Sequence, residues 1–82
     1  MQLAIVKFVD STTFGHWDTI DNVDTLAPKT CLAAGWLVEK TEKLVKVALL
    51  ISDKADAMSN WIVIPAGCVL SVEVVMEAAL DE

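Results

Sequence analysis

The chain has 82 residues, 55% of them hydrophobic, and twelve acidic residues against six lysines give it a net charge of −6. This length predicts a single domain, 1–82, whose hydrophobic core is only marginally large enough to keep the chain folded. Because nucleic-acid binders depend on basic side chains to neutralise phosphates, the charge disfavours direct binding to DNA or RNA.

So high an apolar content in so short a chain indicates either a membrane span or self-association. The longest uncharged run, 57–72, contains Asn60, Pro65 and Gly67 and is shorter than the ~20 apolar residues that a spanning helix needs. The first ten residues lack the basic start and the cleavage site of a signal peptide. We therefore expect a cytoplasmic protein without membrane association, whose surplus apolar surface is covered by copies of the same chain.

The first half of the chain predicts one strand, a long polar loop and a β-hairpin. The strand, 3–9, is rich in β-branched residues, and the loop after it closes at Pro28. Two apolar strands, 30–39 and 44–52, flank the charged turn "KTEK". A helix over these two segments is rejected, because Gly35 and the valine content favour strands and no N-cap opens the run.

The second half predicts two further strands around a proline corner. The loop 52–59 leads into a short strand, 60–64, which stops at Pro65 because proline cannot donate to a ladder. In 69–76 apolar and polar residues alternate, which is typical of a half-buried strand. The last six residues, "EAALDE", form either a helical turn or a frayed end.

The three central strands are apolar on both faces. In 30–39, for example, Leu32 and Trp36 share one face while Cys31 and Leu37 share the other. A free monomeric barrel buries one face of its sheet and leaves the other in water. We therefore expect a closed homo-oligomer, in which a second copy covers the outer face.

Short strands in this order predict an all-β fold, a small closed barrel. The order of strand, long loop, hairpin, loop, strand and tight corner resembles that of Src-homology-3-like and Sm-like barrels. The resemblance implies five strands, with a long loop after the first and a 3-10 turn before the last, at "IPAGCVLSVEVV" (64–75).

The chain also resembles a set of short uncharacterised proteins of tailed bacteriophages. These share an Asp-Ser pair, a tryptophan followed by acids, a Cys-x-x-x-Gly-aromatic-Leu strand and an Ile-Pro-x-Gly-Cys-Ile corner. The matches here are Asp10-Ser11, Trp17-Asp18 with Asp21, Cys31-Gly35-Trp36-Leu37 and Ile64-Pro65-Gly67-Cys68-Val69, where a valine replaces the last isoleucine. The resemblance implies a phage accessory protein and supplies no activity.

The cysteines predict packing and no metal chemistry. Cys31 and Cys68 lack CxxC spacing and lie inside apolar runs, so we expect two small buried hydrophobes. Two scattered cysteines and one histidine cannot assemble a structural zinc site.

The loop segment "DSTTFGHWDTIDN" (10–22) holds the only histidine of the chain. Ser11, His16 and Asp10 or Asp18 are the residue types of a hydrolytic triad, but they share one loop, and no glycine-rich oxyanion turn accompanies them. We therefore expect no catalytic residues.

A cation site in the same loop is also disfavoured. The candidate ligands are His16, Asp18, Asp21 and Asp24, but the aspartates are spaced by three, which does not match the alternating ligands of a calcium loop. We expect neither a metal nor a cofactor.

Two interpretations of this loop remain open. It is either a solvated connection pinned to the barrel by its aromatic side chains, or a surface that contacts a partner. On the second interpretation a rigid indole, a titratable imidazole and an acidic rim form the contact, and the binding residues are Phe14, His16, Trp17, Asp18 and Asp21.

The sequence therefore predicts a protein that acts by binding and is not an enzyme. The first hypothesis is an oligomeric inhibitor or modulator of a host protein in the host cell cytoplasm, because an acidic surface suits basic targets. The alternatives are an oligomeric sponge for a small nucleotide signal and a minor structural component of the phage particle.

Overall fold

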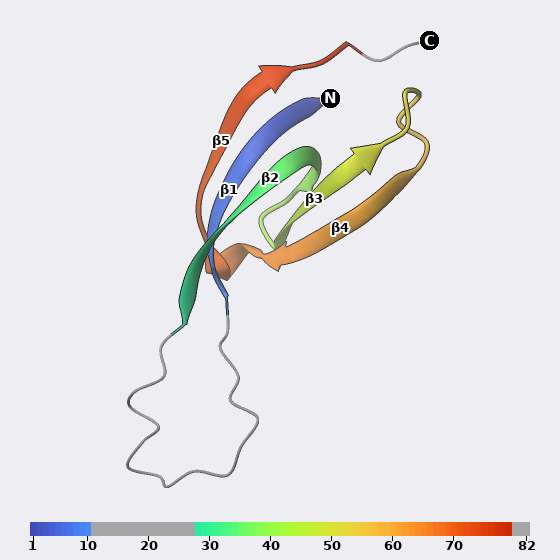
Figure 1. Cartoon of the computed structure of the whole chain (residues 1–82). Coiled ribbons are helices and arrows are strands. Elements are labelled where there is room, and N and C mark those ends of the chain that lie inside the picture. Colours follow the sequence, from blue (N-terminus) through green and yellow to red (C-terminus); the bar gives the residue numbers. More distant parts are fainter. Residues whose placement is uncertain (11–27, 80–82) are drawn as a thin grey trace, which may run out of the picture.

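The computed structural model describes residues 1–10 and 28–79 (Figure 1). These residues form an all-β structure, and they contain no helix with the length and apolar content of a membrane span. The elements are β1 (Gln2–Asp10), β2 (Lys29–Lys40), β3 (Leu44–Ile51), β4 (Met58–Pro65), the 3-10 turn η2 (Ala66–Cys68) and β5 (Val69–Glu77). The five expected strands and the 3-10 turn before the last of them are confirmed.

The strands form one antiparallel sheet in the order β4-β3-β2-β1-β5. Strand β2 joins the two halves of the sheet, because its first part pairs with β1 up to Trp36 and its second part pairs with β3 from Trp36 onward. The hairpin β3–β4 and the pair β1–β5 diverge above η2 in Figure 1. Within the described residues β4 and β5 are edge strands, so the sheet is open and the expected closed barrel is not confirmed.

The buried core lies on one face of this bent sheet. Its five-residue cluster comes from β1, β3 and β4, and cysteine, valine, alanine and leucine side chains of β2, η2 and β5 pack against it. We call this side of the sheet the inner face and the opposite side the outer face. The cluster consists of Val6, Phe8, Val45, Val47 and Ile64.

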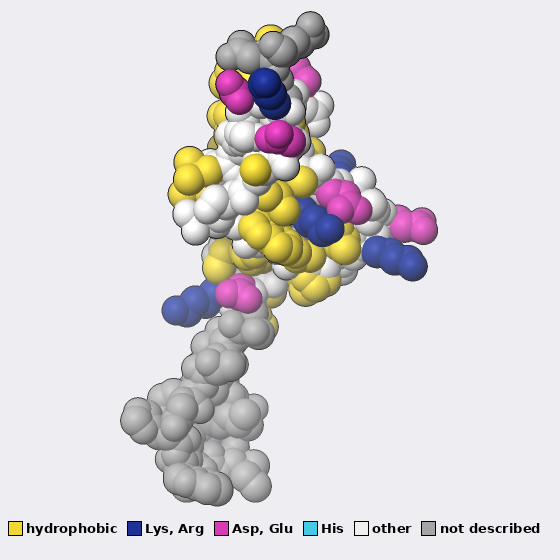
Figure 2. Space-filling model, turned by 90° about the vertical axis from the view of Figure 1, so that its right-hand side faces the viewer, with side chains coloured by type: hydrophobic (Ala, Val, Ile, Leu, Met, Phe, Trp, Pro, Cys, Tyr) yellow, Lys and Arg dark blue, Asp and Glu magenta, His cyan; other side chains and the backbone are white. Residues whose placement is uncertain are grey.

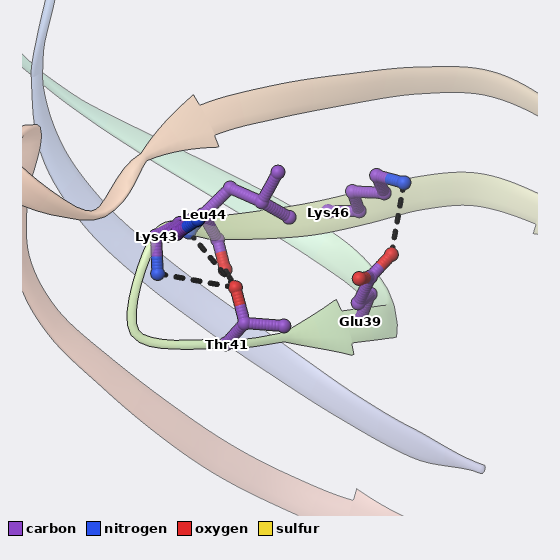
Figure 3. Close-up of polar contacts among 5 residues, drawn as sticks. All are labelled: Glu39, Thr41, Lys43, Leu44 and Lys46. Carbon is purple, nitrogen blue, oxygen red and sulfur yellow. Dashed lines mark hydrogen bonds and ion pairs between the residues drawn. The ribbon is translucent and has the colours of Figure 1, made fainter.

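The β2–β3 turn is held by one threonine side chain (Figure 3). The Thr41 hydroxyl accepts hydrogen bonds from the backbone N–H groups of Lys43 at 3.1 Å and Leu44 at 3.2 Å. This turn also fixes the corner before β5, since the Ala66 N–H donates to the Lys43 carbonyl at 2.9 Å. The predicted charged hairpin turn is thus tied to η2.

The β3–β4 loop is organised around Ser52. Its hydroxyl donates to an Asp56 carboxylate oxygen at 2.7 Å and accepts from the N–H groups of Asp56 and Ala57, each at 3.0 Å. Ala55 adopts a left-handed conformation, with φ of 59°, and its N–H donates to the Ser52 carbonyl at 2.8 Å. The loop therefore closes on itself and brings β4 back alongside β3.

Gly35 lies so close to β3 that a side chain has no room there. A Cβ atom at this position would lie 2.5 Å from the carbonyl oxygen of Ala48 and 2.9 Å from a Val47 methyl group. Real Cβ atoms do not come so close to a backbone oxygen, and that oxygen cannot move without shifting β3. Glycine is therefore required here for lack of space, since its φ is not positive.

We expect Gly35→Ala to lower the free energy of unfolding by about 1–3 kcal/mol, because the added methyl group forces the strands apart. Urea denaturation measures the loss. Gly67→Ala is the matched control, since no atom lies within 4 Å of the Cβ that it adds. Equal stability of the two variants would show that β2 and β3 do not depend on this close approach.

Candidate interaction surface

The residues predicted to bind a partner lie outside the described residues, and so do Ser11 and Asp24 of the catalytic and metal alternatives. The described residues show only where the segment that carries them is attached: Asp10 at the end of β1 pairs with Lys29 at the start of β2. The segment thus leaves and re-enters the sheet on neighbouring strands. The predicted binding residues in it are Phe14, His16, Trp17, Asp18 and Asp21.

An apolar pocket of about 220 Å³ opens beside this attachment point. It is lined by residues 8–10 of β1, residues 62–65 of β4, and Cys68. Asp10 supplies the one charged group of the lining. Such a lining suits an apolar side chain better than an anionic ligand.

Both cysteines contact the core but are only half-buried. Cys31 and Cys68 are free thiols that pack against the buried cluster, and the Cys31 Sγ lies 3.8 Å from the Lys29 carbonyl. Their expected role as small core hydrophobes is confirmed for packing and corrected for burial, since both side chains are only partly buried. No three His, Cys, Asp or Glu side chains gather as a metal site within residues 1–10 and 28–79.

One apolar row crosses all five strands on the outer face. The ladder pairs Met76 with Leu3, Leu3 with Trp36, Trp36 with Ala48, and Ala48 with Trp61. Directly paired residues of an antiparallel sheet point to the same side. The two indoles therefore flank the Ala48 methyl group, which is fully buried, while the Trp61 side chain remains 51% exposed.

Large apolar side chains are exposed on both faces of the sheet. On the outer face Leu32 is 70% exposed, and the row described above adds Trp61 and Met76. On the inner face Leu49 is 60% exposed, because it lies past Ala48, the last β3 residue that pairs with β2. The two-sided apolar pattern expected from the sequence is therefore present in the folded chain.

Charged groups lie both among and around the apolar side chains of one side of the molecule. Figure 2, which views the molecule from the side of β4 in Figure 1, shows hydrophobic side chains at the middle of the face, a lysine and an acidic side chain among them, and further charged side chains toward the margins. On β3 the Lys46 ammonium group pairs with a Glu39 carboxylate oxygen at 2.8 Å (Figure 3). Both side chains are partly exposed, so the pair adds little stability.

Comparison of the chain with known protein families, curated proteins and solved structures finds no match. The function is therefore inferred from the chain's own residues and geometry. The sequence predicts a binding surface in the segment after β1, whereas the described residues place the exposed apolar side chains mainly on β3, β4 and β5. In the sequence, this surface is indicated by the uncharged run 57–72, which includes all of β4.

We expect Trp61→Ser to change the free energy of unfolding by about 1 kcal/mol or less in dilute protein, because half of the side chain is already in water. Ile64→Ser on the same strand is the control. Its side chain is 2% exposed, and a buried hydroxyl without a partner should cost several kcal/mol. Chemical denaturation compares them, and a large loss for Trp61→Ser would mean that the outer face is part of the core.

Proposed function

We propose that this chain is a non-enzymatic accessory protein of a bacteriophage, which acts by binding a host protein and works as a closed homo-oligomer. The observation that carries the proposal is the apolar surface exposed on both faces of one small sheet. Monomeric proteins rarely leave large apolar patches in water, and such patches mark sites of association. The two surfaces provide for a second copy and for another partner.

A Src-homology-3-like, Sm-like barrel is the finer fold that we propose. Its support is the strand order β4-β3-β2-β1-β5, the lone 3-10 turn between β4 and β5 among the described elements, and the long connection between β1 and β2. In this proposal the sheet curls around the buried cluster and leaves a gap between its two edge strands.

A protein partner is favoured over a small nucleotide. Three pockets lined by described residues contain no lysine, and most of their lining residues are apolar. Phosphate groups require clustered N–H donors or cationic side chains. The net charge of −6 also favours a basic protein surface as the target.

Sedimentation velocity at micromolar concentration tests the oligomer, and we expect a discrete species at an integral multiple of the 8.9 kDa chain mass. Native mass spectrometry after incubation in host lysate then tests the partner, and we expect a complex with a basic host protein. A monodisperse monomer at high concentration contradicts the first part of the proposal. A bound nucleotide in place of a protein contradicts the second.

A further inference from the structure

We propose that two copies of this chain join edge to edge through β4, antiparallel about a two-fold axis, so that the two sheets become one continuous ten-stranded sheet. The inference rests on the proposed homo-oligomer and names the strand that forms it. An edge strand presents a row of backbone N–H and C=O groups that pair with another strand unless the edge is protected.

The β4 edge carries no charge, and its one backbone irregularity is Asn60, whose φ of 53° interrupts the ladder with β3 between the Ala48–Trp61 and Leu50–Ser59 pairs. Its sequence, MSNWIVIP, makes it the one strand of the five described that has no charged residue. The nearest charged residues along the chain are Asp56 and Glu73. Proline stands only at its last position, Pro65, where the strand already ends.

The β5 edge, by contrast, is protected in two ways. Its register against β1 shifts twice, which leaves Leu70 and Val75 as extra residues in the ladder and interrupts the row of edge groups. It also carries Glu73 and Glu77. Pairing of β5 with a second β5 would bring these carboxylates together, which is unfavourable.

The absence of charge makes β4 the strand at which two copies repel each other least. Two chains of net charge −6 repel each other over most approaches. The uncharged run 57–72 is the longest stretch that two copies can bring together without placing carboxylates face to face. A two-fold axis makes the contact self-complementary and closes the assembly at two copies.

In such a pairing, β4 side chains on both faces of the sheet contact the second copy. A two-fold axis perpendicular to the sheet keeps the outer face of both copies on one side. When Ile62 lies at the axis, Trp61, 51% exposed, faces Val63 of the second copy, 42% exposed, on the outer face. Ile62, 40% exposed, meets its counterpart on the inner face. Cross-strand contacts of aromatic and β-branched side chains are among the favourable pairs of antiparallel sheets.

Single glutamates placed on different parts of the full chain test the proposal. Val63→Glu places the new carboxylate on β4 opposite Lys46, and its matched control, Leu32→Glu, places one on β2 opposite Lys7. Ser59→Glu is a second β4 variant at a polar, exposed position, and Val75→Glu charges the β5 edge. Each variant adds one negative charge, and sedimentation equilibrium measures its dimer dissociation constant.

We expect Val63→Glu and Ser59→Glu to raise the dimer dissociation constant about tenfold or more, because a charged side chain on an edge strand opposes its pairing with a second strand. Leu32→Glu and Val75→Glu should dimerise as the unmodified chain does. An oligomer that survives both β4 substitutions overturns the inference and leaves the proposed homo-oligomer standing. Dissociation by Val75→Glu would indicate β4 paired with β5, and dissociation by Leu32→Glu would indicate packing of outer faces. A monomeric unmodified chain overturns both proposals.

Discussion

The close approach of Gly35 to the Ala48 carbonyl is the contact on which the rest of this sheet depends. It lets β2 pair with β1 along one half and with β3 along the other, so that a single strand belongs to both parts of the sheet. The buried cluster from Val6 to Ile64 forms between these parts. A side chain at position 35 would push β2 away from β3 and so disturb the buried cluster.

In this arrangement the core occupies one face of the sheet, and the remaining apolar side chains lie on the surface. A chain of 82 residues with 55% hydrophobic composition has too little interior for all of them. The surplus lies on the outer face and along the β3–β4 hairpin, where Leu49 and Trp61 are more than half exposed. Association through the uncharged β4 edge would remove part of this surface, the side chains of β4, from water, while the acidic remainder of the chain keeps other approaches repulsive.

The strand positions could be predicted because they depend on local signals. Pro65 ends β4 and alternation defines β5, and both signals lie within the segments themselves. The role of Gly35 could not be predicted, since the atom that forbids a side chain there comes from Ala48 on another strand. Whether the sheet closes could not be predicted either, because closure depends on how the whole sheet curves and not on any one segment. Of the candidate site, the two-sided apolar pattern followed from residue spacing, whereas Trp17 and its neighbours lie outside the described residues.

Hydrogen exchange as a function of protein concentration tests the β4 interface most directly. The account predicts that backbone amides of β4, residues 58–65, exchange more slowly as the concentration rises through the dimer dissociation constant, because free edge groups become paired. Amides of β5, residues 69–77, should exchange at the same rate throughout. Exchange in β4 that does not depend on concentration, or protection that arises in β5 instead, would contradict the account.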